Sequence, residues 1–242
     1  MIELPRKVAI LQSNYIPWKG YFDLLNSVDD FIFYDKVQYT SGDWRNRNRI
    51  KTAEGLPWLT IPVHQEKLAQ KIVETRIADA KWGAQHWRKI AQAYARAPHF
   101  ELYRAELEEL YRAADSKWLS EVNQRFISII NRWLGSRTQL HSSADFAERT
   151  SPDRTARLVQ LVQAVGGTEY LVGPAAASYI DEAQFTQAGI TLTWMSYDGY
   201  PEYRQLHGAF EHRVSVLDLL LNEGPAAPQY MLSFADRATA ML

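Results

Sequence analysis

The sequence contains no cysteine among its 242 residues. Disulfide bonds, zinc sites with cysteine ligands and thiolate nucleophiles are therefore excluded. Long apolar runs are also missing, because no uninterrupted stretch approaches the roughly 20 residues that span a bilayer. The first eleven residues show no cleavage-site pattern of a signal peptide. From these absences we expect a cytoplasmic protein without a membrane span.

An excess of charge of one sign is absent as well. Lys and Arg total 27 against 28 Asp and Glu, so the formal net charge is −1. Such a balance provides no field over the whole molecule that would attract nucleic acid or an anionic membrane. With 46% hydrophobic and 23% charged residues, the composition is that of an ordinary globular chain. We expect no nucleic-acid partner, and the sequence leaves the oligomeric state open.

Apolar runs alternate with helical patterns along much of the chain. The run Lys7–Leu11 predicts a buried strand, and it is followed by a short predicted helix over Trp18–Ser27 and a strand over Asp30–Tyr34. A strand, helix and strand within about 30 residues form a βαβ unit, which implies a parallel sheet with a right-handed crossover. Later strands are predicted over Thr138–His141, Glu169–Val172 and Thr191–Met195, and later helices over Thr155–Val165, Glu182–Ala188 and Val214–Leu221.

Helical periodicity interrupts this alternation between Lys81 and Leu134, where about three helices fit. We therefore predict an α/β fold of the Rossmann-like type, with a mostly parallel sheet flanked by helices and an inserted or lateral helical block. The predicted segments are a βαβ unit with an Arg/Asn-rich stretch (1–80), the helical block (81–135), the remaining α/β part of the same domain (136–224) and a loosely packed tail (225–242).

Polar and aromatic residues follow the first predicted strand. Ligands of parallel sheets usually lie beyond the carboxyl ends of the strands, where this chain places Gln12, Tyr15, Trp18 and Lys19. The free N–H groups at a helix N-terminus beside Lys19 predict a docking place for a phosphate or carboxylate. Gly20 permits a close approach of the backbone there. Simple packing of the aromatic rings on the sheet is the alternative interpretation.

A second cluster follows the second predicted strand, with Asp35, Gln38 and Tyr39 ahead of an Arg/Asn run. An extended chain would place the cations of this run on one face and its amides on the other. Guanidinium groups grip phosphate or carboxylate at two points, whereas a buried amide needs designated hydrogen-bond partners. An ordinary charged edge or a nucleic-acid patch would explain the same cations. The cationic face comprises Arg45, Arg47, Arg49 and Lys51, and the opposite face Trp44, Asn46, Asn48 and Ile50.

The histidines supply the candidate general bases. His86 lies on a predicted helix face, and His207 lies in a loop after Tyr203 and Gln205. Histidine titrates near neutrality, so either one suits proton transfer, although a lone histidine is more often a core or surface residue than a catalyst. His64, His99, His141 and His212 have no carboxylate or second histidine at metal-ligand spacing, and we expect no metal site. Tyr170, Tyr203 and Gln205 follow predicted strand ends, where they would form a pocket wall or pack as ordinary aromatics.

Several segments resemble a known family. They are YIPWKGYF (Tyr15–Phe22), DKVQYTSGDWRNRNRIK (Asp35–Lys51), WLTIPV (Trp58–Val63), Trp82 with His86, EYLVG (Glu169–Gly173) and GITLTW (Gly189–Trp194). Together these segments resemble the WbqC-like family, and the resemblance extends roughly from Val8 to Asn222. The chain departs from the family pattern at Ser13 and His212, where Pro is common.

The resemblance implies an enzyme of bacterial surface-polysaccharide (O-antigen) or natural-product biosynthesis. The implied activity is acyl or aminoacyl transfer to an amino sugar or a related small amine. We predict that the substrate is anionic or nucleotide-linked, and that His86 or His207 removes the amine proton. Arg45, Arg47, Lys51 and Lys19 would hold the anionic group, Gln12, Gln38, Asn46 and Asn48 would orient the acceptor, and Trp18, Tyr39 and Trp44 would stack on its ring.

Two alternatives remain open from the sequence. An adenylate-forming or nucleotidyl-transfer enzyme would need ATP and Mg²⁺. The first predicted strand, loop and helix are similar to those of pantothenate-synthetase-type nucleotidylyl transferases, but Trp18 and Tyr21 stand where those enzymes use two histidines. A non-catalytic binding module for a glycan precursor is the other alternative. Outside the ATP-dependent alternative, the sequence implies no particular cofactor.

Overall fold

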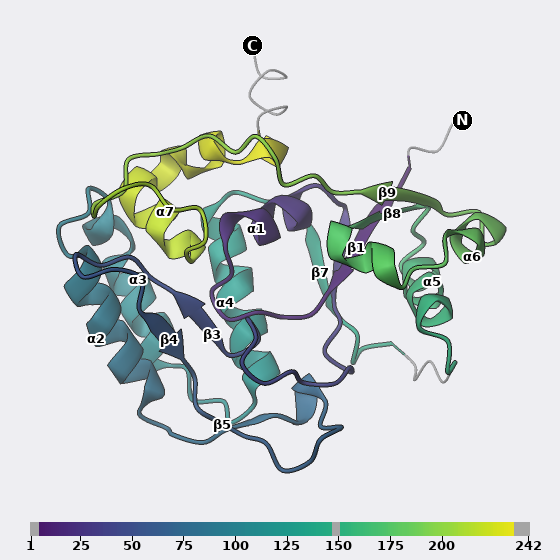
Figure 1. Cartoon of the computed structure of the whole chain (residues 1–242), viewed down its shortest axis with the longest axis horizontal. Helices are drawn as coiled ribbons and strands as arrows, with labels where there is room; N and C mark the ends of the chain where they lie inside the picture. Colours follow the sequence, from purple (N-terminus) through teal and green to yellow (C-terminus); the bar gives the residue numbers. More distant parts are fainter. Residues whose placement is uncertain (1–4, 147–150, 235–242) are drawn as a thin grey trace.

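A parallel five-stranded sheet forms the centre of the protein, whose computed structural model describes residues 5–146 and 151–234 (Figure 1). The order of the strands across the sheet is β7-β2-β1-β8-β9. The strands are β1 (Lys7–Leu11), β2 (Asp30–Phe33), β7 (Gln139–Ser142), β8 (Glu169–Val172) and β9 (Thr191–Trp194). This arrangement confirms the predicted α/β, Rossmann-like fold, and each strand begins and ends within one residue of its predicted limits.

The direction of winding reverses at β1, which pairs in parallel with β2 on one side and with β8 on the other. Successive strands of the first half are added outward from β2 to β7, and those of the second half from β8 to β9. In open α/β sheets, ligands bind beyond the carboxyl ends of the strands near such a reversal. The loops that follow β1, β8 and β9 are therefore the positions where a site is expected.

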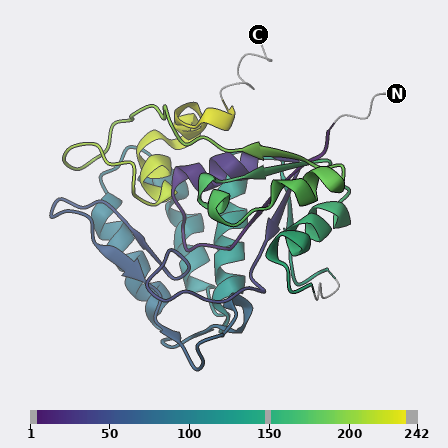
Figure 2. The same ribbon diagram turned by 45° about the vertical axis from the view of Figure 1, so that its right-hand side comes forward.

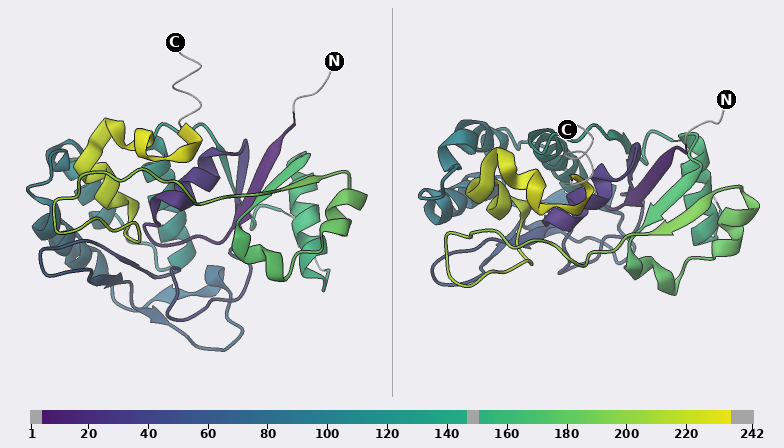
Figure 3. Two further views of the ribbon diagram at one scale, coloured as in Figure 1. Left: turned by 45° about the horizontal axis from the view of Figure 1, so that its top comes forward. Right: turned by 90° about the horizontal axis from the view of Figure 1, so that it is seen from above.

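Side-chain alternation along the strands separates two hydrophobic cores. Ala9 and Phe31 face a large core built from α1 (Lys19–Asn26), the helical block and α7 (Val216–Glu223). Val8 and Ile32 face a smaller core under α5 (Arg154–Ala164) and α6 (Glu182–Gln187). Figure 3 shows the helical block and the α5–α6 pair on opposite sides of the sheet.

The helical block consists of three helices, as predicted. They are α2 (Trp82–Tyr94), α3 (Phe100–Arg112) and α4 (Leu119–Trp133). Two short antiparallel pairs connect β2 to this block: β3 (Arg47–Arg49) with β4 (Trp58–Thr60), and β5 (Val63–His64) with β6 (Arg76–Ile77). A 3₁₀ helix, Ile72–Glu74, precedes β6, and another, Pro174–Ser178, follows β8. Within the described ranges no helix has the length and apolar character needed to cross a membrane.

The prediction of a loosely packed tail is wrong for residues 225–233. A 3₁₀ helix, Gly224–Tyr230, follows α7, and the side chains of Ala227 and Met231 are buried in the large core. The backbone N–H groups of Leu232 and Ser233 then donate to the Asp23 carboxylate of α1, each at 2.8 Å. Burial of these side chains therefore packs the segment against the core despite its Pro and Ala content. Positions 235–242 of the predicted tail lie outside the described residues.

Candidate functional site

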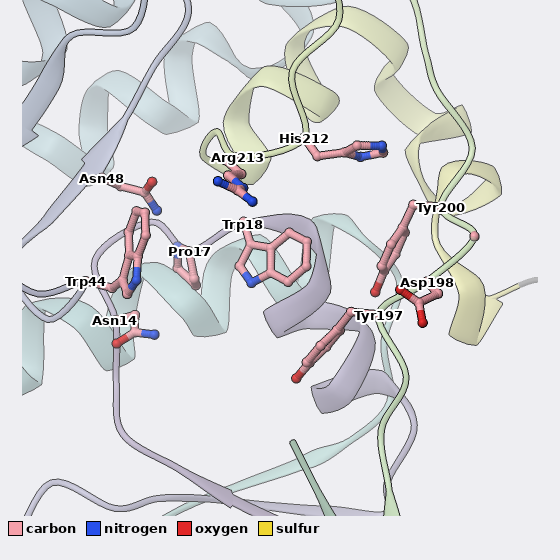
Figure 4. Close-up of a pocket in the computed structure, with 11 residues that line it drawn as sticks. Asn14, Pro17, Trp18, Trp44, Asn48, Tyr197, Asp198, Tyr200, His212 and Arg213 are labelled. Carbon is pink, nitrogen blue, oxygen red and sulfur yellow. The ribbon is translucent and has the colours of Figure 1, made fainter. Parts of the chain in front are cut away.

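Two cavities lie at the carboxyl edge of the sheet. The first, here called the aromatic cavity, has a volume of about 500 Å³. Three parts of the chain form it: the loop after β1, the segment before β4, and the long loop between β9 and α7 (Figure 4). Its lining residues are Asn14, Pro17, Trp18, Trp44, Asn48, Tyr197, Asp198, Gly199, Tyr200, His212 and Arg213.

The β1–α1 loop and the Arg/Asn segment meet through the backbone at this cavity. The N–H of Tyr15 donates to the carbonyl of Trp44 at 3.0 Å. The buried amide of Asn48 donates to the carbonyl of Ile16 at 2.8 Å. Ile16 has φ of +37°, which is a strained conformation for a β-branched residue. Asn48 thus has the partner that its burial requires, and it holds a strained loop against the cavity.

Trp18 owes its position to a glycine two residues later. An added Cβ on Gly20 would lie 2.4 Å from the Trp18 ring, so only glycine lets the indole lie across the start of α1. The ring centroid of Trp18 is 5.4 Å from that of Tyr197 and 5.8 Å from that of Tyr200. Figure 4 shows these three rings on one side of the site and Trp44 on the other. The aromatic cavity therefore presents ring faces, which suit a flat or pyranose-shaped ligand.

Polar groups surround these rings. The Nη1 of Arg45 donates to Oδ1 of Asn14, which fixes the amide at the cavity. Arg213 is exposed at the opening. The His212 ring lies edge-on to Phe210, with a centroid distance of 4.5 Å, and its Nδ1 is buried without a hydrogen-bond partner among the described residues. Burial, together with the nearby Lys19 charge, lowers the pKa of His212, so the imidazole is neutral at pH 7.

The second cavity, here called the cationic cavity, has a volume of about 820 Å³ and lies beyond β1, β2 and β7. Gln12 and Gln38, both predicted to orient a substrate, belong to it. The full lining is Gln12, Tyr34, Lys36, Val37, Gln38, Thr40, Lys71, Ser143, Ser151, Pro152, Arg154, Arg157 and Leu161. Among the described residues, its lining contains four cations and no carboxylate. In the part of the chain that the structure describes, no group of three or more His, Asp or Glu side chains is placed to hold a metal ion.

Comparison with known proteins identifies the family of the chain. The family model of the WbqC-like protein family matches residues 12–230. The chain belongs to the WbqC-like family. It is also 48% identical over 227 residues to an uncharacterized protein of Mycobacterium tuberculosis (strain ATCC 25618 / H37Rv), Rv1507c, covering 93% of this chain and 97% of that protein. No solved structure matches this chain. The family match includes every residue that lines either cavity.

The predicted cationic face does not form a single patch in this WbqC-like protein. The guanidinium groups of Arg47 and Arg49 lie on the Trp58 ring, 4.3 and 4.5 Å from its centroid. Lys51 is buried, and its Nζ donates to the Gln205 side chain and the Ala209 carbonyl. The regular alternation fails because only Arg47–Arg49 is a strand. The cations therefore point to three different places.

Lys19 is also used internally. It is buried, its Nζ donates to the Pro201 carbonyl at 3.0 Å, and the Tyr200 ring centroid lies 4.8 Å from that Nζ. Burial lowers the pKa of Lys19 to about 8, against the opposing effect of Asp23. Lys19 lines neither cavity, so its predicted role of holding an anion is not supported by its position.

Other predicted substrate-binding residues form hydrogen bonds inside the protein that stabilise its loops. Asp35 is fully buried and accepts hydrogen bonds from Ser13 N–H at 2.8 Å and Gln124 Nε2 at 3.0 Å, which ties the β1–α1 loop to α4. Asn46 donates to the Ile61 carbonyl at 2.8 Å. Tyr39 is buried, and its backbone N–H donates to the Gln70 carbonyl at 2.7 Å.

Tyr170, Tyr203 and Gln205 also form internal contacts. The ring of Tyr170 stacks on Phe185 with a centroid distance of 5.1 Å. The Tyr203 hydroxyl donates to Asp218 at 2.8 Å, and the Gln205 amide donates to that hydroxyl at 3.2 Å. None of the three lines the aromatic or the cationic cavity.

The two predicted bases lie apart from both cavities. His86 is buried among aromatic residues of the large core, beside Tyr15 and Trp82. His207 donates from Nε2 to the Ala93 carbonyl at 2.9 Å, in a separate surface cavity with Thr52. The sequence reasoning missed the residues of the long β9–α7 loop, namely Asp198, Tyr200, His212 and Arg213. The one sequence feature that pointed to this loop is its position directly after a predicted parallel strand, where ligands usually bind.

Proposed function

We propose that this WbqC-like protein is a transferase that modifies an amino sugar or a related small amine by acyl or aminoacyl transfer, and that the acceptor binds in the aromatic cavity. The family resemblance points to surface-polysaccharide or natural-product biosynthesis as the setting. The observation that supports the acceptor site best is the pair Trp18 and Trp44, with the amides of Asn14 and Asn48 beside them. Indole faces pack on the C–H face of a sugar ring, while amides exchange hydrogen bonds with its hydroxyl groups.

His212 is the residue that this proposal assigns as the base. It lines the aromatic cavity, its imidazole is neutral at pH 7, and its buried Nδ1 leaves Nε2 as the nitrogen available to a ligand. The amine nitrogen of the acceptor attacks the carbonyl carbon of an activated acyl donor. The new C–N bond replaces the bond to the leaving group, and His212 takes the amine proton and passes it to that group.

Binding of the acceptor is tested by titrating D-glucosamine, with glucose as the neutral comparison, while the tryptophan fluorescence is recorded. Trp44→Ala should weaken binding at least tenfold at little cost in stability, because the Trp44 side chain is already 42% exposed. Trp194→Ala is the matched control, since Trp194 is 40% exposed and lines neither cavity. Equal weakening in the two variants would contradict the acceptor site.

Turnover is tested by mass spectrometry of amino sugars incubated with acyl-CoA or aminoacyl donors. General-base catalysis is worth about 10²–10⁴-fold, so His212→Asn should lower kcat by about that factor and leave acceptor binding nearly unchanged. Turnover that depends on ATP and Mg²⁺ and releases pyrophosphate would instead favour the nucleotidyl-transfer alternative. Binding without turnover for any donor would favour a binding module.

A further inference from the structure

We infer that the cationic cavity binds the diphosphate group of a nucleoside-diphosphate-linked ligand. This inference deepens the proposed function, on which it rests for the nature of the substrate, by assigning the substrate's anionic group to residues that the sequence did not single out. Lys36, Lys71, Arg154 and Arg157 all line this cavity, and no Asp or Glu of residues 5–146 and 151–234 does. The arginines and the lysine of the predicted Arg/Asn run do not line this cavity.

In the described part of the chain, the four cations differ from other basic side chains in their ion pairing. Within residues 5–146 and 151–234, none of them forms an ion pair with a carboxylate, whereas exposed arginines such as Arg76 and Arg112 do. Two carboxylates whose charge interacts with these cations already have other partners. Asp153 caps α5 by accepting from Thr155 N–H at 2.7 Å and accepts from the Gln184 amide at 2.8 Å. The Gln184 hydrogen bond lowers the pKa of Asp153 most, and the charge of Arg157 lowers it less. Glu74 pairs with Lys67 at 3.0 Å, although it also feels the charge of Lys71.

Neutral groups hold the two arginines in place. Arg157 donates to the Ser151 carbonyl at 2.6 Å and to the Tyr34 hydroxyl at 3.3 Å. The guanidinium carbon of Arg154 lies 3.6 Å from the centroid of the Tyr179 ring. Lys36 makes a long hydrogen bond of 3.5 Å to the Phe146 carbonyl. These contacts orient the cations, whose positive charge no ion pair among the described residues neutralises. A diphosphate compensates that charge, and guanidinium groups bind phosphate oxygens at two points.

The position and the size of the cavity fit the same ligand. Gln12, Tyr34 with Lys36, and Ser143 follow the carboxyl ends of three neighbouring strands, and Figure 2 shows this edge of the sheet with α5 beside it. The eleven-residue α5 begins at Arg154, so its N-terminal dipole adds to the positive potential. A volume of about 820 Å³ exceeds the need of one phosphate and lies in the range of whole-ligand sites.

The two cavities share the β1–α1 loop. Gln12 lines the cationic cavity, and Asn14 lines the aromatic cavity. Two residues of extended chain span about 7 Å at most, which is shorter than a nucleoside-diphosphate sugar. A ligand of that class is therefore long enough to place its diphosphate in one cavity and its sugar in the other.

Isothermal titration calorimetry of the full chain with UDP, UMP, uridine and inorganic pyrophosphate tests the inference. UDP should bind at least tenfold more tightly than UMP, uridine should not bind measurably, and pyrophosphate should compete with UDP. Raising the salt concentration should weaken UDP binding. Lys71→Gln and Arg154→Gln should each weaken UDP binding at least tenfold, while Arg88→Gln, an exposed charge-matched control on α2, should not change it. Pyrophosphate that binds while UDP does not would overturn the nucleotide part of the inference.

Absence of binding for both UDP and pyrophosphate, or equal affinity in Lys71→Gln, Arg154→Gln and the unmodified chain, would overturn the inference as a whole. Unchanged melting temperatures in the variants confirm that any loss is local. This outcome is separable from failure of the proposed function. A chain that binds UDP through Lys71 and Arg154 but shows no transfer activity retains the diphosphate site and loses only the transferase assignment.

Discussion

The Tyr15 hydroxyl lies 2.9 Å from Nδ1 of His86, in the middle of the large core. The same hydroxyl lies 2.8 Å from that of Tyr111, and the His86 ring also hydrogen-bonds the backbone of Thr60. Burial lowers the pKa of His86 to about 4, so the ring is neutral at pH 7. His86 therefore connects the β1–α1 loop to the helical block and to β4, far from solvent.

Acid should destabilise the protein through His86. In the unfolded chain this histidine binds a proton near pH 6.5, whereas in the folded chain it does so only near pH 4. The unfolded state thus binds more protons in this interval, and the free energy of unfolding falls as the pH is lowered from 6.5 to 4. At about 1.4 kcal/mol per pKa unit, the loss is roughly 3 kcal/mol.

Urea unfolding at several pH values measures this loss. His86→Gln should remove it and give a flatter pH dependence between pH 6.5 and 4. His64→Gln, on exposed β5, is the control and should follow the unmodified protein. Parallel curves for His86→Gln and the unmodified protein would show that this histidine is not the acid-sensitive group.

The Tyr94 hydroxyl is the centre of a second buried network. It donates to Asp218 at 2.8 Å and accepts the backbone N–H of Lys51 at 2.9 Å. Tyr94→Phe leaves both buried groups without this partner, at about 1–3 kcal/mol for each buried polar group left unsatisfied. We expect a loss of about 2–4 kcal/mol in urea unfolding. Tyr103 is the control, because it is buried and its hydroxyl has no such network among the described residues. Tyr103→Phe should cost under about 0.5 kcal/mol. Similar losses in both variants would argue against a stabilising role of the Tyr94 network.

Gly20 should affect stability and acceptor binding only by making room for the Trp18 ring. Alanine within a helix is usually favoured over glycine by about 1 kcal/mol, but here the added Cβ would collide with that indole. Gly20→Ala should therefore destabilise the protein and weaken acceptor binding in the unmodified background. In a Trp18→Ala background it should be neutral or stabilising. A double-mutant cycle by thermal unfolding measures this coupling, and additive effects would rule it out.

The lowered pKa of Lys19 predicts that the free energy of unfolding depends on pH above neutrality. Its pKa is lowered to about 8 in the folded protein and is near 10.5 when unfolded. The unfolded chain then binds more protons between pH 8 and pH 10, so the free energy of unfolding rises with pH in that window. Relative to Lys19→Met, the unmodified protein should gain up to about 1.4 kcal/mol per pH unit. The exposed Lys89→Met is the charge-matched control, and no gain over Lys19→Met would refute the assignment.

The sequence predicted the sheet well because each strand is short, apolar and bounded by turn residues. Lys7–Leu11 and Glu169–Val172 coincide with their predicted limits. The site was predicted only in part. Trp18, Trp44 and Asn48 do meet at one cavity, because the strands place both loops at the same edge of the sheet. The partner loop of residues 195–215 has no periodicity, so its contribution depends on tertiary contacts that a pattern does not record.

The cations show why side-chain direction is harder to infer than strand position. Arg47 and Arg49 alternate as a strand should, but the neighbouring Trp58 attracts both guanidinium groups. Lys51, beyond the last paired residue, turns toward Gln205, which is 154 positions away in the sequence. Conversely, Lys36, Lys71, Arg154 and Arg157 are scattered along the chain and form no motif. Only the folded sheet brings these four side chains to one cavity.

The anchoring of Leu232 and Ser233 on Asp23 has a consequence for biosynthesis. Asp23 belongs to the helix that begins directly after Trp18, yet the backbone groups that satisfy its buried carboxylate are more than two hundred residues downstream. While the ribosome is still extending the chain, that carboxylate has no such donors. The complete set of hydrogen bonds on Asp23 can therefore form only after residue 233 has left the exit tunnel.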